Sequence, residues 1–201
     1  MLKVIAFDCD GVMFDTREAN REYYDQLLAH FERPPMSPDQ LDFVHINTVD
    51  KSVAHLFEPA LIADVNAYRR TIGYLPFIKY MRIEPDLKPL LQGLRRTYRT
   101  AVATNRTDTM DRVLEEFDLN GSFDLVVTAL DVPNPKPAPD CLAKVACAFQ
   151  VAPSEVVYIG DSVLDQQAAQ AAGTQFVAFD NPALEADKHI TTLKELYYLT
   201  E

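Results

Sequence analysis

The chain has 201 residues, of which 48% are apolar and 24% charged, so it can bury a sizeable core without disulfides or a structural metal. A net charge of -11, with no long run of Lys or Arg, argues against nucleic acid and anionic membranes as partners. No apolar stretch approaches a membrane span and the N-terminus lacks a signal peptide's apolar centre, so we expect a cytoplasmic protein. Cys9, Cys141 and Cys147 have no metal-binding or redox spacing, which argues against a disulfide framework or zinc site.

The stretch VIAFDCDG at residues 4–11 predicts a buried strand that ends at two acids. Side chains two positions apart on an extended chain point the same way, so Asp8 and Asp10 can converge on one small volume. Gly11 permits a sharp turn directly after them. Acids at such a junction can also serve only as turn formers, which is the structural alternative. An EF-hand is excluded because the glycine comes too early and no Glu follows at the required position.

Residues 16–81 predict an inserted helical domain. Apolar residues recur at helical spacing from Tyr24 to Phe31, and Pro34-Pro35 ends that pattern. Ser37 with Pro38 marks a new helix start, and further helical patterns cover residues 49–57 and 61–72. No strand-like run interrupts this segment.

From Glu84 onward, helical patterns alternate with short apolar runs. The runs at residues 100–105, 125–128, 156–161 and 176–179 predict strands, and the periodic segments between them predict helices. Such alternation is typical of an α/β fold in which a parallel, doubly wound, Rossmann-like sheet carries helices on both faces. We therefore predict a core domain of residues 1–15 and 82–201, a helical domain of residues 16–81, and a short closing helix at 191–199.

Polar residues follow the predicted strands where ligands bind in such sheets, beyond the carboxyl ends. Five of them follow strands directly, one lies in the loop NPKPAP, and one lies a helical turn further on: Asp8, Asp10, Thr104, Asn105, Asp161, Lys136 and Asp165.

Gathered at one end of the sheet, the four acids would repel one another by roughly 4 kcal/mol per pair at ~4 Å and an effective dielectric constant of about 20. Lys136 alone cannot offset that repulsion. A divalent cation can, and an all-oxygen set without His or Cys favours Mg²⁺. Such a site also favours an anionic substrate, because a phosphoryl group can bridge the metal, the lysine ammonium and the threonine hydroxyl.

With these residues in place, the sequence resembles the haloacid dehalogenase superfamily of phosphohydrolases. Its four motifs match in order and spacing: DCDG, Thr104 in ATN, Lys136 in NPKPAPD, and GDSVLD at residues 160–165. The segment 16–81 is similar to the helical cap that the subfamily of phosphoglycolate phosphatases and β-phosphoglucomutases inserts after the first strand. The resemblance implies that the cap closes over the site and favours small phosphorylated metabolites.

The resemblance also implies a role for each matching residue. Asp8 would be the nucleophile that forms an aspartyl-phosphate, and Asp10 would protonate the leaving alcohol and then activate water. Lys136 would neutralise the phosphoryl charge and hold Asp8 in place. The implied phosphate contacts are Thr104, Asn105, Arg106 and Lys136. The implied Mg²⁺ ligands are Asp8, the backbone carbonyl of Asp10, Asp161 and, directly or one layer behind, Asp165.

Several alternatives stay open at the level of sequence. Lys136 can be a solvated loop lysine, and Asp165 an acid on a helix surface. Asp10 argues against dehalogenases and phosphonate-cleaving members, which lack this second acid, and leaves a phosphatase or a β-phosphoglucomutase-like phosphomutase. Two other classes are a phospho-accepting receiver and a catalytically silent phospho-ligand binding or regulatory protein. The oligomeric state, monomer or homodimer, is open.

The cap residues that would contact the substrate are also candidates only, because each has a solvated surface role as its alternative. They are His45, Asn47, Lys51, His55, Arg69, Arg70, Lys79 and Arg82, with Arg106 from the core. The segment FVHINTVDKS departs from the glycine-containing cap segment of similar phosphoglycolate phosphatases and mutases, so the substrate is not fixed by the resemblance.

Overall fold

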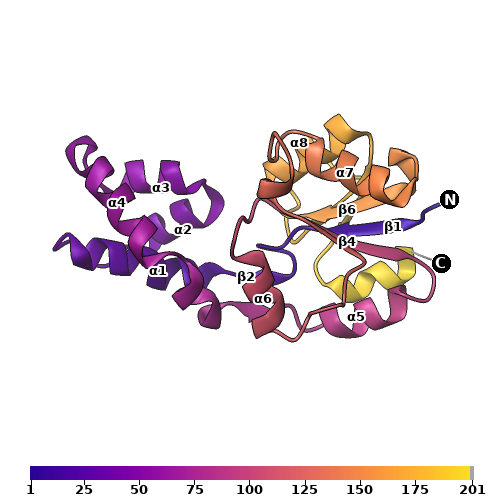
Figure 1. The fold of residues 1–201 in the computed structure, drawn as a ribbon, viewed down its shortest axis with the longest axis horizontal. Coiled ribbons are helices and arrows are strands. Elements are labelled where there is room, and N and C mark those ends of the chain that lie inside the picture. Colours follow the sequence, from indigo (N-terminus) through magenta and orange to yellow (C-terminus); the bar gives the residue numbers. More distant parts are fainter. Residues whose placement is uncertain (200–201) are drawn as a thin grey trace. The chain divides into compact units, whose positions relative to one another are not determined.

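The computed structural model describes residues 1–199, apart from the side chains of Ile46, Tyr198 and Leu199 (Figure 1). The chain forms two compact units, and the first combines Met1–Asp15 with the segment from Ile83 onward. The second unit is Thr16–Arg82.

The first unit is built on a six-stranded sheet with the order β5-β4-β1-β6-β7-β8. All neighbouring strands in it are parallel. The strands are β1 (Val4–Phe7), β4 (Arg99–Ala103), β5 (Leu125–Val127), β6 (Val156–Gly160), β7 (Gln175–Phe179) and β8 (Lys188–Ile190). This arrangement confirms the predicted Rossmann-like α/β fold.

Helices cover both faces of this sheet (Figure 1). The helices α7 (Asp140–Phe149) and α8 (Val163–Ala172) lie on one face, and α5 (Leu87–Leu94) with the 3₁₀ segment η5 (Leu193–Leu199) lies on the other. The core beneath α7 and α8 includes Val4, Ala6, Tyr158 and Leu142, all fully buried. Burying a side chain of the size of Leu142 stabilises the fold by roughly 1.5–3 kcal/mol, which explains why these helices hold to the sheet.

The strand order places the chemistry at one edge of the sheet. The chain passes outward from β1 to β4 and β5 on one side, and to β6, β7 and β8 on the other. The carboxyl ends of β1, β4 and β6 therefore meet at a point where the strand order reverses, which is where ligands bind in open α/β sheets. The helix α6 (Met110–Glu116) and the 3₁₀ turns η3 (Ala129–Asp131) and η4 (Pro153–Glu155) complete this unit.

The second unit consists of helices, and the structure describes no strand between residues 16 and 81. Its elements are α1 (Arg17–His30), α2 (Pro38–Ile46), α3 (Val49–Leu56), η1 (Pro59–Leu61), α4 (Ile62–Ile72) and η2 (Leu75–Tyr80). Ser37 begins α2 with a capping box, because its side chain accepts from the Gln40 amide while the Gln40 side chain accepts from the Ser37 amide. Over the whole described range, no helix has both the length and the apolar character needed to cross a bilayer.

Three short strands are absent from the prediction. The strand β8 contains one buried residue, Ile190, so it lacks the apolar run that identifies the other strands. The strands β2 (Phe14–Asp15) and β3 (Arg82–Ile83) form a separate two-stranded sheet and have only two residues each, too few for a periodic pattern.

Candidate active site

Four of the predicted site residues are buried at the carboxyl edge of the sheet. Asp8 directly follows β1, and its amide donates to the Ile159 carbonyl at 2.9 Å. Thr104 directly follows β4, and its amide donates to the Val127 carbonyl at 3.0 Å. Asp8, Thr104, Lys136 and Asp165 are all buried. Polar side chains are seldom buried so completely unless they are paired, so their partners define the site.

The Lys136 ammonium lies between two of the acids. Its Nζ is 2.7 Å from Asp8 Oδ1 and forms a second ion pair with Asp165 Oδ1. It also donates to the Tyr158 hydroxyl at 2.8 Å, so each of its three N–H groups has an acceptor within reach. The alternative of a solvated loop lysine is therefore wrong.

Asp165 is fully buried, so the alternative of an acid on a helix surface is also wrong. Its Oδ2 accepts from the Ser162 hydroxyl and from the Ser162 amide, while its Oδ1 lies 2.8 Å from the Tyr158 hydroxyl. Tyr158 and Ser162 were not predicted as site residues. Tyr158 sits inside the apolar run of β6, where a single hydroxyl is the only signal that its side chain must find a polar partner.

Asp161 completes a cluster of three carboxylates. One oxygen from each of Asp8, Asp161 and Asp165 lies within 4.8 Å of the others. Glycines make this approach possible: a Cβ atom on Gly11 would lie 2.0 Å from Asp161 Oδ2, and one on Gly160 would lie 2.3 Å from Asp165 Cβ. Each glycine in the motifs DCDG and GDSVLD therefore leaves the space that an acid occupies.

The cluster is electrostatically strained. Burial, together with the charge of Asp165, raises the pKa of Asp8 to about 7, and burial with the charge of Asp8 raises the pKa of Asp161 to about 8. Burial opposes the charge on Asp165, yet Lys136 and the hydrogen bonds from Ser162 and Tyr158 hold its pKa below the usual range. Burial also opposes the charge on Lys136, and the two neighbouring carboxylates outweigh it and raise the pKa of the ammonium.

The donor set fits a hard divalent cation. Asp8 Oδ1 is buried, and although Lys136 Nζ is near it, no donor among the described residues is aligned with it as a hydrogen bond. The cluster offers oxygen ligands only, which suits Mg²⁺. The carboxylate of Asp10 is not part of this cluster; the predicted ligand was its backbone carbonyl.

The Asp10 side chain instead meets Arg106. Arg106 Nε donates to Asp10 Oδ2 at 3.0 Å, and Arg106 Nη2 pairs with Asp10 Oδ1, so the guanidinium grips the carboxylate with two parallel hydrogen bonds. Arg106 Nη1 donates to the Thr109 hydroxyl, and the Arg106 amide donates to the Thr104 hydroxyl, both at 3.1 Å. The sequence predicts Arg106 as a contact of the phosphate or of the rest of the substrate, and it does not predict this pair.

Asn105, also predicted as a phosphate contact, is engaged by the main chain of Lys136. Its side-chain oxygen accepts from the Lys136 amide at 2.8 Å, and its side-chain nitrogen donates to the Lys136 carbonyl at 2.9 Å. This reciprocal pair fixes the backbone from which the Lys136 side chain projects.

The candidate substrate contacts of the helical unit have local partners or lie on its surface. The His55 ring stacks on Phe43 with centroids 3.9 Å apart, and the Asn47 side chain donates to the Phe43 carbonyl. Arg69 donates to Asn66 and pairs with Asp50. His45 is half-buried, whereas Lys51, Arg70, Lys79 and Arg82 are exposed. Their role toward a substrate stays a prediction.

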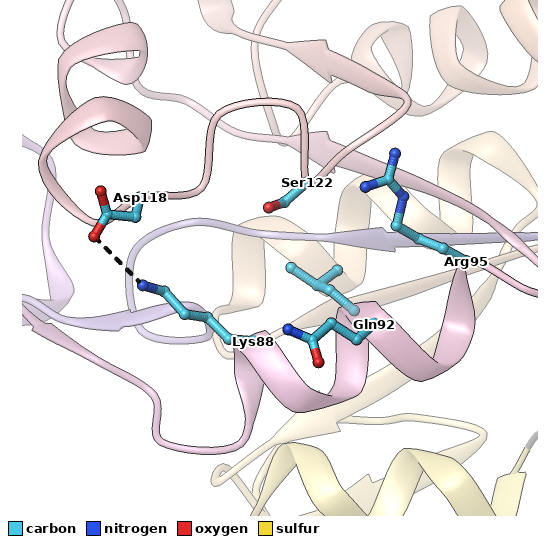
Figure 2. Close-up of a pocket in the computed structure, with 6 residues that line it drawn as sticks. Lys88, Gln92, Arg95, Asp118 and Ser122 are labelled. Atoms are coloured by element: carbon cyan, nitrogen blue, oxygen red, sulfur yellow. Dashed lines mark ion pairs between the residues drawn. The ribbon is translucent and has the colours of Figure 1, made fainter.

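A shallow pocket of about 90 Å³ contains none of the predicted site residues (Figure 2). Its lining comes from α5 and from the segment between α6 and β5, and comprises Lys88, Leu91, Gln92, Arg95, Asp118 and Ser122. Lys88 and Asp118 face each other across it at 4.0 Å. The candidate active site is thus located by its buried charges rather than by the depth of a cavity.

The fold and the charged cluster define an α/β enzyme whose acids and lysine gather at the carboxyl edge of a parallel sheet. The family model described as haloacid dehalogenase-like hydrolase matches residues 5–179. The chain therefore belongs to the haloacid dehalogenase-like hydrolases, which confirms the predicted family and its hydrolase class.

Comparison with individual proteins gives the same family. A haloacid dehalogenase superfamily hydrolase of subfamily IA, variant 1, from Geobacter sulfurreducens is 34% identical, with a TM-score of 0.89 over 100% of this chain and 97% of that one. A phosphoglycolate phosphatase from Chromobacterium violaceum is 27% identical over 98% of this chain and 96% of its own length. The pyrophosphatase PpaX from Bacillus pumilus is 27% identical over 87% of this chain and 81% of its own. Relatives of equal identity thus carry different substrate names.

Proposed function

We propose that the protein is a Mg²⁺-dependent phosphatase that hydrolyses a small phosphomonoester through an aspartyl-phosphate. One observation carries this proposal: Lys136 Nζ lies 2.7 Å from Asp8 Oδ1, inside a cluster where three carboxylates approach within 4.8 Å. A buried nucleophile beside a buried cation is the arrangement that attack on an anionic phosphoryl group requires.

In the first step, an Asp8 oxygen attacks phosphorus while the bond from phosphorus to the leaving oxygen breaks. Asp10 gives its proton to that oxygen, so the product leaves as a neutral alcohol. In the second step, water attacks the aspartyl-phosphate, its proton passes to Asp10, and the bond from Asp8 to phosphorus breaks. Inorganic phosphate is released and Asp8 is restored.

The remaining residues position and neutralise the transferring group. The Thr104 hydroxyl donates to a phosphoryl oxygen, and the Lys136 ammonium offsets its negative charge. Asp165 keeps Lys136 in place by accepting a hydrogen bond from its ammonium. Both Asp165 oxygens are already engaged, since they accept hydrogen bonds from Lys136, Ser162 or Tyr158. We therefore assign Asp165 to orienting the lysine rather than to holding the metal directly.

Asp8, Asp161 and the backbone carbonyl of Asp10 are the proposed ligands of Mg²⁺. When bound, the cation would neutralise the clustered acids and draw charge from the phosphoryl oxygens. Burial and, after it, repulsion from neighbouring carboxylates raise the pKa values of Asp8 and Asp161, and these raised values support the assignment because a bound cation would offset both effects.

The substrate is proposed as a small phosphorylated metabolite. The names of the relatives, phosphoglycolate phosphatase and pyrophosphatase, support a compact phosphate ester or anhydride and do not choose between them. We also propose that residues 16–81 act as the cap domain of this enzyme.

The test is phosphate release from a panel of phosphorylated short acids, sugars, nucleotides and pyrophosphate, with Mg²⁺ or with EDTA. We expect turnover that requires the metal, that is abolished in Asp8→Asn, and that leaves a slowly decaying phosphoenzyme in Asp10→Asn. Full activity of Asp8→Asn would disprove the covalent route. Conversion of one sugar phosphate into its isomer, without release of phosphate, would favour a phosphomutase instead.

A further inference from the structure

The pair of Arg106 and Asp10 carries an inference about the leaving group. The Arg106 side chain is only 8% exposed, although it belongs to a residue type that normally lies in water. Nε and Nη2 grip the two Asp10 oxygens and Nη1 is held by Thr109. The guanidinium, a planar fork of N–H donors, is therefore held in one position within the first unit and is largely shielded from water.

The proposed mechanism requires Asp10 to serve the leaving oxygen. Asp10 can do so only if the Arg106 guanidinium pairs with another anion. While both oxygens of Asp10 accept hydrogen bonds from the guanidinium, the carboxylate is held toward Arg106 and is not free to turn toward a leaving alcohol. Release of Asp10 alone would leave a buried cation without its anion, which is unfavourable by itself. A second anion that pairs with the Arg106 guanidinium in place of Asp10 removes that obstacle.

We propose that Arg106 recognises a carboxylate on the leaving alcohol and, by exchanging Asp10 for it, frees Asp10 to serve the leaving oxygen. A planar carboxylate fits the fork that Asp10 now occupies, because guanidinium and carboxylate pair through two parallel hydrogen bonds. This inference rests on the proposed function and narrows its substrate class to phosphomonoesters of small hydroxy acids.

The location of Arg106 supports this assignment over a contact with the transferring phosphoryl group. Its backbone amide donates to Thr104, the proposed phosphoryl contact, while its side chain extends to Asp10, the proposed partner of the leaving oxygen. The guanidinium thus lies on the leaving-group side of the site. Arg106 is in this sense a specificity residue, and Thr109 is the residue that orients it.

The experiment compares three substrates: 2-phosphoglycolate, 2-hydroxyethyl phosphate, which has a hydroxymethyl group in place of the carboxylate, and p-nitrophenyl phosphate, whose leaving group needs no proton. We measure kcat and KM for the wild type, Arg106→Met and Arg106→Lys. Arg112→Met is the matched control, because Arg112 lies close in sequence and forms its ion pairs within residues 1–199 with Glu115 and Glu116 on α6.

We expect the wild type to prefer 2-phosphoglycolate over 2-hydroxyethyl phosphate by at least about tenfold in kcat/KM, as a charge-assisted pair provides. In Arg106→Met, kcat/KM for 2-phosphoglycolate should fall at least about tenfold further than kcat/KM for p-nitrophenyl phosphate, mainly through KM. Arg106→Lys keeps the charge without the fork and should lose most of the preference, whereas Arg112→Met should keep it.

An unchanged preference in both Arg106 variants would overturn the proposal, as would equal losses on all three substrates, which indicate a phosphoryl contact. If Arg106→Met does not fold, Arg106→Lys decides between these outcomes. A wild type that hydrolyses p-nitrophenyl phosphate but does not prefer 2-phosphoglycolate over 2-hydroxyethyl phosphate refutes this inference alone. A wild type that hydrolyses none of the three, nor any compound of the wider panel, refutes the proposed function as well.

Discussion

The carboxylate of Asp165 is completely buried and pairs with the ammonium of Lys136, which is buried with it. Lys136 in turn lies 2.7 Å from Asp8, so one cation is shared between two acids. An ammonium shared in this way is held in a single position, and Asp165 is the residue that holds it when Asp8 is occupied by chemistry.

Replacing Asp165 with Asn should therefore destabilise the protein and reduce activity. The substitution keeps the shape but removes a buried charge partner, and breaking such a pair costs about 3–5 kcal/mol. Urea unfolding at neutral pH measures the loss, and phosphate release measures the effect on Lys136. Asp111→Asn is the control, since Asp111 lies in the first turn of α6, as Asp165 lies in the first turn of α8, but is exposed. An unfolding free energy of Asp165→Asn equal to that of the wild type would contradict the role of the pair.

Tyr158→Phe should lower stability by about 1–3 kcal/mol while leaving measurable activity. The change removes the hydroxyl that accepts from Lys136 and lies within hydrogen-bond distance of Asp165 and the Ala103 carbonyl. One buried N–H group of Lys136 then lacks its acceptor, and an unsatisfied buried donor costs about 1–3 kcal/mol. Activity should persist because both acids still flank the ammonium. Tyr197→Phe removes an exposed hydroxyl bonded to the Pro89 carbonyl and should cost less than about 0.5 kcal/mol. Similar losses in the two variants would show that the Tyr158 hydroxyl is not part of the charged network.

Gly11→Ala should abolish Mg²⁺-dependent turnover. Its Cβ would lie 2.0 Å from Asp161 Oδ2, so the carboxylate must leave its present place in the acidic cluster. Gly121→Ala is the matched control, because Gly121 also has a positive φ, of 71°, but no atom of the part of the chain that the structure describes lies within 4 Å of a Cβ placed there. Both variants should lose about 1 kcal/mol of stability to backbone strain, and only Gly11→Ala should lose activity. Retained activity in Gly11→Ala would mean that Asp161 can shift without consequence.

The sequence predicted the acids because each follows an apolar run, and the ends of parallel strands must meet. It could not identify the partners of these acids, since partner choice depends on distances that no local pattern encodes. Tyr158 lies inside a predicted strand, so its place in the site is not predicted, and Arg106 is predicted as a phosphate or substrate contact, since no local pattern shows its pairing with Asp10, 96 positions away. The strand β8 was missed for a related reason, since its pairing with β7 and not its own composition makes it a strand.

The last prediction concerns pH and metal together. The pKa values of Asp8 and Asp161 are raised from 3.8 to about 7 and about 8, so between about pH 4 and pH 8 the folded protein binds more protons than the unfolded chain. In that range the unfolding free energy falls as pH rises, by at most about 1.4 kcal/mol per pH unit for each group. The lowered pKa of Asp165 affects the unfolding free energy below this pH range, and the raised pKa of Lys136 affects it above this range.

Without metal, the unfolding temperature should therefore decrease from about pH 5 to about pH 8. Because Mg²⁺ binds the ionised carboxylates, its addition should raise the unfolding temperature more at pH 8 than at pH 5. Thermal unfolding in EDTA and in excess Mg²⁺ measures both effects. Asp161→Asn removes one of the two titrating acids, so it should flatten the pH dependence in EDTA and shrink the effect of the metal. An EDTA-treated wild type that becomes more stable toward pH 8, or a metal effect independent of pH, would show that Asp8 and Asp161 do not share a cation site.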